Sequence, residues 1–378
     1  MSNVMSKRSM VSCVALITLV GAGCGNVENE VANSSVDSVA RSVTSYNSKP
    51  NGTGVHVGST QPESWFGLAS TSLSWFMNGF SQRADGSYWA TGWYSADIGL
   101  ISADARIVGA QVGRLSGQVR SIRTSGSQLQ IELVDAQGRV TTLQNSQLIG
   151  LTLSLRVPDV TGLLYQSYQL RFDSAEQVDS QFGDVNGYKI SYLQQGLLSL
   201  LGSSWKSYCR GSEGESQRAV FYQGAQWNPL DGSRQDGSRL VTMTCESGAV
   251  ARCMSWGYRP WGSAQQSDGQ SISLLNHMQA CIHMKRASYC GDSSTYTVDG
   301  THLFVNDQLS PQINQGSLAR IEAQWSPSGA TCLSNRRHPE LLFLGCANPL
   351  PSCPTSPTGD YLLANGLPPA GSLLGLSD

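Results

Sequence analysis

The chain has 378 residues, which is enough for one large domain or two of modest size. Charged residues make up only 14% of it and glycine occurs 40 times, a composition typical of β-rich proteins with many loops. The formal net charge of −2 argues against a nucleic-acid binder or a polybasic membrane-surface protein. No apolar run approaches the roughly 18 residues that a transmembrane helix needs.

The N-terminus has the features of an export signal. Lys7 and Arg8 precede an apolar stretch too short to span a bilayer, so we expect residues 1–23 to be a signal peptide. The small residues before Cys24 resemble a bacterial lipobox, in which the cysteine receives a diacylglycerol and becomes the first mature residue. An ordinary secretory signal is the alternative. Because Gly25 and not aspartate follows the cysteine, we expect the outer membrane rather than the inner one.

Two segments with different patterns follow Cys24. Residues 24–62 are polar beyond the cysteine, and we expect them to form a flexible tether with a reach of about 30 Å. Residues 63–200 are predicted to form a β-rich module that opens with an aromatic segment at 63–95. Runs in this module alternate polar and apolar residues, which predicts antiparallel strands with one face in water. These runs are residues 127–134, 139–143, 151–156 and 165–172.

Eight cysteines lie in the C-terminal half, and none lies between Cys24 and the first of them. An even number in one region of an exported protein predicts a disulfide framework, although about 105 pairings stay open. A metal site is the competing interpretation, but an oxidising compartment and the absence of a CxxC pair favour disulfides. The predicted disulfide residues are Cys209, Cys245, Cys253, Cys281, Cys290, Cys332, Cys346 and Cys353.

The cysteine-rich domain, residues 201–348, is expected to contain one helix among strands. Residues 271–285 place apolar side chains at helical spacing. Residues 296–305 predict a hairpin, because Asp299-Gly300 suits a type I′ turn. Residues 349–378 are rich in proline, glycine and leucine, and we expect this tail to lie outside the packed domain.

Several motifs occur in order in this half: residues 245–253 (CESGAVARC), 256–261 (WGYRPW), 277–281 (HMQAC) and 287–290 (ASYC). Together they resemble the ADYC domain family of bacterial exported proteins and lipoproteins, over about residues 205–346 and reaching back to about residue 106. The family is named for an Ala-Asp-Tyr-Cys tetrapeptide, and Ser288 replaces its aspartate here. If that aspartate were catalytic or bound a metal, this chain would lack it. The resemblance implies an exported protein and no particular activity.

His277 and Cys281 are the candidates for a metal-binding pair. They are four residues apart and share a helical face, whereas His283 points elsewhere. The interpretation that we favour makes Cys281 a disulfide partner and His277 a histidine at the edge of the core. A metal-binding module that uses His277, Cys281 and Cys290 is kept as the second alternative, while no metal or cofactor is expected.

No catalytic residue is predicted. A cysteine nucleophile would leave an odd number of cysteines for disulfides, and no G-x-S-x-G motif occurs. Asp292, Asp299 and Asp307 could serve a two-carboxylate glycosidase, but Asp292 and Asp299 suit turns better. An exported hydrolase of polysaccharide or peptide, with paired carboxylates, is therefore the first alternative function.

Trp256, Tyr258 and Trp261 are the predicted binding surface, because aromatic faces stack on sugars and apolar groups. Packing in the core of a disulfide-bonded domain is the alternative for the same rings. As a whole, the sequence predicts a mainly β protein with a minor α component (α+β). We expect it to be exported, anchored to the membrane by lipid on Cys24, and non-catalytic. Its expected partners are the membrane and an envelope glycan or protein, with no nucleic acid.

Overall fold

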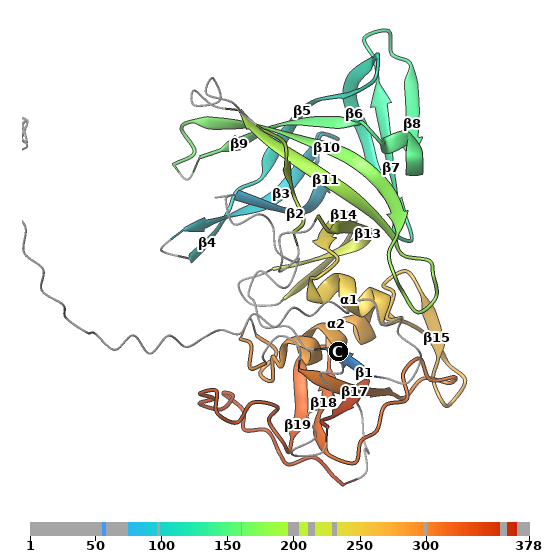
Figure 1. Ribbon diagram of the computed structural model, residues 1–378, viewed down its shortest axis with the longest axis vertical. Coiled ribbons are helices and arrows are strands. Elements are labelled where there is room, and N and C mark those ends of the chain that lie inside the picture. Colours follow the sequence, from blue (N-terminus) through green and yellow to red (C-terminus); the bar gives the residue numbers. More distant parts are fainter. Residues whose placement is uncertain are drawn as a thin grey trace, which may run out of the picture. The chain divides into compact units, whose positions relative to one another are not determined.

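The computed structural model describes residues 55–57, 75–96, 99–159, 161–195, 204–210, 216–228, 233–292, 294–297, 301–355 and 361–368 (Figure 1). These residues all belong to one compact unit, residues 43–378. They are mostly strands, with two α-helices in the described part, so the predicted fold class is confirmed. The elements in chain order are β1 (Val55–Val57), β2 (Trp75–Gln82), β3 (Tyr88–Ala96), β4 (Gly99–Ser102), β5 (Ala105–Val112), β6 (Leu115–Ser125), β7 (Gln128–Val134), β8 (Val140–Gln144), the 3-10 helix η2 (Asn145–Leu148), β9 (Thr152–Pro158), β10 (Tyr165–Gln177), β11 (Asn186–Gln195), β12 (Lys206–Ser207), β13 (Arg218–Trp227), β14 (Arg234–Cys245), α1 (Ala249–Ser255), β15 (Ser263–Gln265), β16 (Ser271–Ser273), α2 (Leu275–Arg286), β17 (His302–Asp307), β18 (Ile321–Ser326), β19 (Gly329–Leu333) and β20 (Leu363–Gly366).

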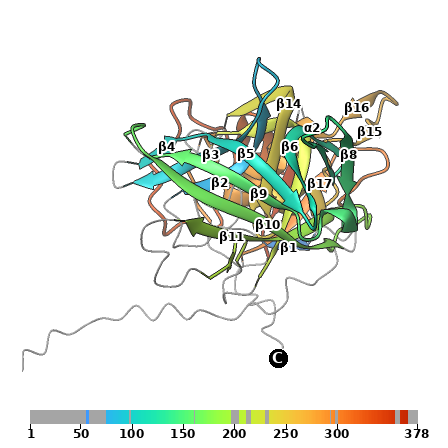
Figure 2. The same ribbon diagram turned by 90° about the horizontal axis from the view of Figure 1, so that it is seen from above.

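Eight strands of the large sheet pair into a closed ring. Their order is β3-β2-β14-β13-β11-β10-β9-β5, and the pairing of β5 with β3 completes the ring. Neighbouring strands run antiparallel throughout. Figure 2 shows β2, β3, β5, β9 and β10 of this ring from above. Each ring strand therefore has a partner strand on both sides along at least part of its length.

Aromatic side chains fill the centre of this ring. Phe172, Tyr188 and Phe221 are buried, and their ring centroids lie 5.7–6.3 Å from one another. The indole N–H of Trp75, also buried, donates a hydrogen bond to the Ala103 carbonyl (2.6 Å). The only polar atom of the Trp75 side chain therefore has a hydrogen-bond partner, as is usual for a buried tryptophan.

Strands β6, β7 and β8 extend the large sheet beyond the ring. β6 pairs with β5 over three residues and then with β7, and β7 pairs with β8. Along β7 buried and half-buried side chains alternate, as predicted for residues 127–134. The turn into β8 is held by Asp135, whose Oδ1 accepts hydrogen bonds from the N–H groups of Gln137 and Arg139 (2.9 Å each).

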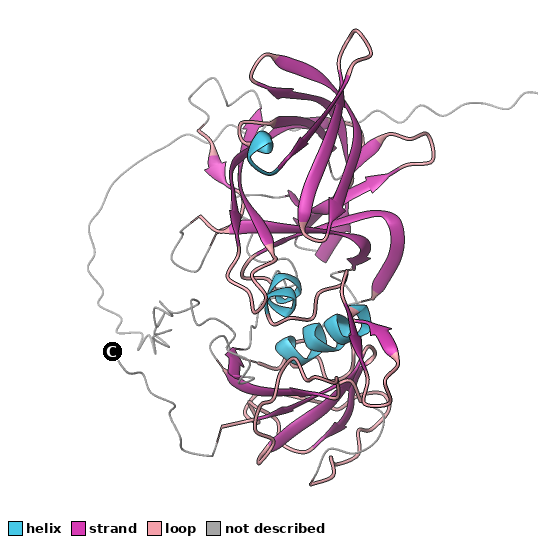
Figure 3. Cartoon of the chain, turned by 90° about the vertical axis from the view of Figure 1, so that its right-hand side faces the viewer, coloured by secondary structure: helices cyan, strands magenta, loops and turns pink. Residues whose placement is uncertain are grey.

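The α-helices lie between the large sheet and a five-stranded sheet of order β1-β17-β20-β18-β19 (Figure 3). α1 contacts β14 and α2, while α2 contacts β18, β19 and β20. Because neighbours cover α2 on several sides, every residue from His277 to Arg286 is buried. Within the described part of the chain, neither α-helix has the length and apolar character needed to cross a membrane.

Two predictions about the C-terminal part are wrong. Residues 296 and 297 form no strand, and β17 pairs with β1 and β20 instead of closing a local hairpin. The predicted turn at Asp299-Gly300 lies outside the described residues. The tail expected outside the domain contains β20, which lies between β17 and β18 in the five-stranded sheet. Leu363 and Asn365 of this strand have no exposed surface, so the segment belongs to the core.

The large sheet continues across the predicted domain boundary at residue 200. β13 and β14, which follow that boundary, belong to the same ring as the earlier strands β2, β3, β5, β9, β10 and β11. The division into modules at 63–200 and 201–348 stays a prediction. The predicted signal peptide, Cys24 and most of the predicted tether lie outside the described residues. Residues 55–57 of that tether form β1, which pairs with β17, so the prediction of a tether is wrong for these three residues.

Candidate functional site

The predicted aromatic surface is not an exposed platform. Tyr258 has no exposed surface, Trp256 is 5% exposed, and Trp261 is half-buried. The Lys285 ammonium lies 5.6 Å from the ring centroid of Trp256, a cation–π contact within the protein. Trp256 and Tyr258 belong to the core that includes residues of both helices and the five-stranded sheet. Trp256 and Tyr258 therefore serve the packing of the core, and ligand binding by Trp256, Tyr258 and Trp261 stays a prediction.

Asp307, at the end of β17, organises the polar centre beside Tyr258. Its Oδ2 accepts hydrogen bonds from the Tyr258 hydroxyl (2.9 Å) and the Asn314 N–H (2.8 Å). Its Oδ1 accepts from the N–H groups of Leu309 and Ile313 (3.2 Å each). Burial raises the pKa of this carboxyl, and the hydrogen bonds oppose that rise. With 1% exposure, Asp307 holds the loop after β17 and is closed to a substrate.

The tetrapeptide at residues 287–290 ends α2. Ala287 adopts a left-handed backbone conformation (φ 52°), and the N–H of Ser288 donates to the His283 carbonyl (2.9 Å). This geometry satisfies carbonyls that the end of a helix would otherwise leave unpaired. The Ser288 hydroxyl donates to the carbonyl of Asp292. The position of the family's aspartate is thus occupied by a fully buried serine with a partner nearby in the chain.

Tyr289, the third residue of the tetrapeptide, leads to a buried ion pair. Its hydroxyl donates to Oε1 of Glu322 (2.6 Å), which also accepts from Nε of Arg337 (2.8 Å). Burial, and next the negative charge of Glu322, raise the pKa of Tyr289, so the hydroxyl keeps its proton. The second oxygen of Glu322 accepts from Nδ2 of Asn365 (2.5 Å), and Nη2 of Arg337 donates to the Met284 carbonyl of α2 (2.7 Å). Both charged side chains have 0% exposure, so this network joins α2, β18 and β20 without contact to solvent.

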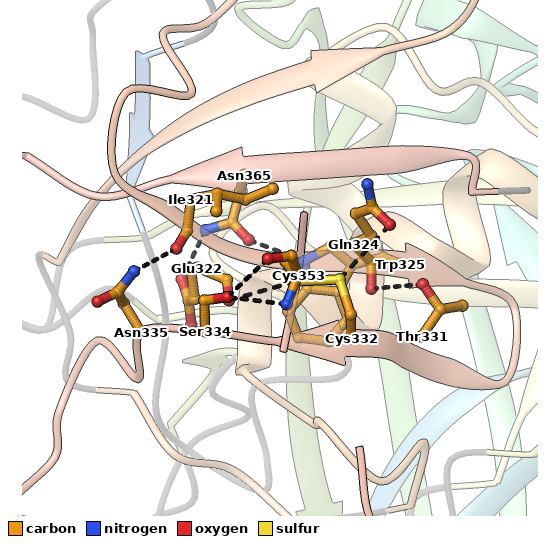
Figure 4. Close-up of a disulfide and its surroundings, with 10 residues drawn as sticks. All are labelled: Ile321, Glu322, Gln324, Trp325, Thr331, Cys332, Ser334, Asn335, Cys353 and Asn365. Carbon is orange, nitrogen blue, oxygen red and sulfur yellow. Dashed lines mark hydrogen bonds between the residues drawn. A yellow bond between two sulfur atoms is a disulfide. The ribbon is translucent and has the colours of Figure 1, made fainter. Parts of the chain in front are cut away.

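All eight predicted cysteines form disulfides, which confirms the predicted framework. The bonds close sequence separations of 21 to 56 residues and stabilise the fold by restricting the unfolded chain. Figure 4 shows one of them beside Glu322 and Asn365, where the N–H of Cys353 donates to the Ser334 hydroxyl (2.8 Å). The pairs are Cys209–Cys245, Cys253–Cys281, Cys290–Cys346 and Cys332–Cys353.

The disulfides overturn the metal-binding alternative. Cys281 is bonded to Cys253 and Cys290 to Cys346, so neither sulfur is available as the thiolate that a metal needs. His277 is 1% exposed, and burial lowers its pKa to about 4, so it is neutral at pH 7. Among the described residues, no group of three or more histidines, cysteines or carboxylates could hold a metal ion.

The residues considered for catalysis have partners within the fold. The disulfides occupy every cysteine in the described part of the chain, which removes a cysteine nucleophile there. The Asp292 carboxylate accepts a hydrogen bond from the N–H of Ser294 (2.9 Å), as expected for a turn. Asp307 lies in the core, and Asp299 lies outside the described residues. The geometry therefore supports structural roles for Asp292 and Asp307.

One exposed apolar feature was missed by the sequence analysis, the turn between β9 and β10. Leu163 is 82% exposed, Leu164 is 70% exposed and Tyr165 is 64% exposed. The alternation of strand residues is interrupted here by Gly162 and two consecutive leucines. That interruption could have predicted an exposed apolar turn, since consecutive apolar residues in a turn cannot all face the core of a sheet.

These contacts define a mainly β, disulfide-bonded protein in which Glu322 and Arg337 form a buried ion pair. The ADYC domain family matches residues 145–339, just over half of the 378 residues, and the chain belongs to this family. The match includes β9, β10 and β11 of the ring as well as both α-helices. No curated protein and no solved structure matches the chain.

Proposed function

We propose that this protein is an exported, lipid-anchored protein of the bacterial cell envelope, with a binding or structural role and no catalysis. The observation that carries the proposal is the pairing of all eight cysteines after Cys24 into four disulfides. Disulfides persist in oxidising compartments and are rare in the reducing cytosol. The predicted signal peptide and the lipobox-like residues before Cys24 support the same route of export.

The environment of the titratable groups supports a role without catalysis. Glu322, Arg337 and Asp307 are buried and bonded to groups of the same chain. His277 has a pKa of about 4 because it is buried, far from the near-neutral value that suits a general base. Catalytic acids and bases must reach a substrate, whereas these groups connect secondary-structure elements. An envelope glycan or protein is the proposed partner class.

Metabolic labelling tests the anchor. Cells that express the full chain are supplied with an alkyne-bearing fatty acid, and we expect label on the wild type and none on Cys24→Ser. Cys13→Ser is the matched control, because Cys13 lies in the predicted signal peptide, and it should label like the wild type. Label that persists on Cys24→Ser, or that is missing from the wild type, would contradict the proposal.

Membrane fractionation tests the destination. The wild type is expected in the outer-membrane fraction of a density gradient, because glycine follows Cys24. Gly25→Asp should move the labelled protein to the inner-membrane fraction. A wild-type protein found mainly in the inner membrane would contradict the proposed location and leave the labelling result unaffected.

A further inference from the structure

We propose that the turn between β9 and β10 is a membrane-contact element that inserts Leu163 and Leu164 into an anionic bilayer. The two leucines are 82% and 70% exposed, and the adjoining Tyr165 is 64% exposed. Residues 161–165 carry no charged side chain. Neighbouring apolar side chains that face water are typical of surfaces that bind another apolar surface.

Asp159 accepts several hydrogen bonds from the described residues of this turn. Its Oδ1 accepts hydrogen bonds from the Thr161 hydroxyl (2.7 Å) and from the N–H groups of Thr161, Leu163 and Leu164 (3.1–3.3 Å). The N–H of Gly162 donates to the Asp159 carbonyl (2.9 Å). The Thr161 hydroxyl, followed by the backbone N–H groups, lowers the pKa of Asp159 against the effect of desolvation. Because the turn satisfies these donors internally, it can enter a headgroup layer without leaving them unpaired.

Two arginines lie behind the turn on one face of the sheet. Arg156 on β9 is directly opposite Arg106 on β5, and both are exposed. Arg156 pairs with Ser167 and Pro158 pairs with Tyr165, so Tyr165 points to the same side as Arg156, about 7 Å further along the strands. Neither guanidinium forms a hydrogen bond or ion pair with the residues that the structure describes, although the charge of Arg106 contributes to the lowered pKa of Asp85. A like-charged pair opposite each other is unfavourable until an anion neutralises it.

An anionic bilayer would bind both the exposed leucines of the turn and the pair of arginines behind it. Phosphate groups of the lipids would neutralise Arg106 and Arg156, while the leucines reach the acyl chains and Tyr165 lies at the interface, where tyrosine is enriched. The inference rests on the proposed function for its membrane. Lipid on Cys24, with the predicted tether, would hold the folded part within about 30 Å of the bilayer. Even weak insertion of the turn then becomes an intramolecular event with a high effective concentration.

Vesicle sedimentation tests the turn without an acyl chain. The protein is the whole chain from residue 24 with Cys24→Ser, and the anionic probe is a vesicle of phosphatidylglycerol and phosphatidylethanolamine. Leu163→Ser with Leu164→Ser should lower the partition coefficient about 10- to 100-fold. Arg106→Gln and Arg156→Gln should each lower it about fivefold. On vesicles of phosphatidylcholine alone, the arginine substitutions should have no effect, because no net anionic charge is present.

The chain offers a matched control for the leucine pair. Leu342 and Leu344 are 79% and 88% exposed but lie away from the β9–β10 turn in the sequence. Leu342→Ser with Leu344→Ser removes the same number of exposed leucines and should leave vesicle binding unchanged. Intact mass without reductant and circular dichroism check that each variant keeps its four disulfides and its fold.

Three outcomes would overturn the inference. The first is that the parent chain does not bind anionic vesicles, and the second is that the substitutions at Leu163 and Leu164 leave binding unchanged. The third is that these substitutions abolish capture of an envelope protein while vesicle binding persists, which would make the turn a protein-docking site. Missing lipid label in cells would contradict the anchor alone, since the vesicle assay uses a chain without lipid.

Discussion

Removing the charge of Glu322 tests whether its buried ion pair with Arg337 is needed for stability. Glu322→Gln keeps the shape of the side chain but leaves the Arg337 guanidinium without its counter-charge at 0% exposure. The loss of one partner of a buried, hydrogen-bonded pair costs about 3–5 kcal/mol of the free energy of unfolding. Each kcal/mol lowers the Tm of a large domain by about 2–4 °C, so we expect a fall of about 6–20 °C.

Urea unfolding with the disulfides intact, followed by tryptophan fluorescence, measures this cost. The matched control is Glu132→Gln, which breaks a pair with Arg123 whose side chain is 49% exposed, and it should cost less than about 1 kcal/mol. Adding Arg337→Met to Glu322→Gln should recover part of the loss, because no buried charge then lacks a partner. If Glu322→Gln cost no more than Glu132→Gln, the assignment of stability to the buried pair would be refuted.

Three further predictions concern stability. Tyr289→Phe removes the hydroxyl that donates to Glu322 and should cost about 1–3 kcal/mol in the same assay, so an unchanged urea midpoint would contradict this contact. Replacing Cys253 and Cys281 together by alanine removes a cross-link over 28 residues and should cost about 2–5 kcal/mol, which an unchanged midpoint without reductant would disprove. Burial lowers the pKa of His277 from 6.5 to about 4. Between these two values the unfolded chain binds a proton that the native state does not, so the contribution of His277 to stability is complete above pH 6.5 and is lost as the pH falls towards 4. His277→Gln should flatten this part of the profile of unfolding free energy against pH, and equal slopes in variant and wild type would argue against a neutral buried histidine.

Local patterns predicted the elements that depend on near neighbours. β7 follows from the alternation of its own residues, and α2 follows from an apolar stripe at helical spacing, although the first residues of the predicted helix form β16. The number of cysteines and the predicted compartment were enough to expect disulfides. The pairing could not be derived, because it depends on which segments the fold brings within bonding distance.

Long-range strand pairing could not be predicted in the same way. The ring closes through two residue pairs between β3 and β5, Trp89 with Arg106 and Ala90 with Ala105. Such a closure depends on the twist and bulges of the whole sheet, and no pattern within either strand encodes it. β20 has only four residues, too few for an alternation signal, and it is a strand because β17 and β18 bond to its two sides.

The burial of the predicted binding residues could not be foreseen for a related reason. An aromatic side chain has the same identity in the sequence whether it faces water or the core. Tyr258 is buried because Asp307 and Asn314, far along the chain, supply the hydrogen bonds that its hydroxyl needs. The exposed leucines of the β9–β10 turn were missed because the run beginning at Tyr165 continues as a regular strand.

The tetrapeptide that names the family connects the end of α2 to the rest of the core in this chain. Ala287 ends the helix, Tyr289 reaches the buried ion pair, and Cys290 is bridged to another cysteine. Ser288 is buried, and its hydroxyl is used by the Asp292 carbonyl, so the site needs no charge to satisfy it. An aspartate can therefore be absent here without loss of the fold. Because these residues serve contacts within the protein, the proposed membrane contact is assigned to exposed groups, those of the β9–β10 turn.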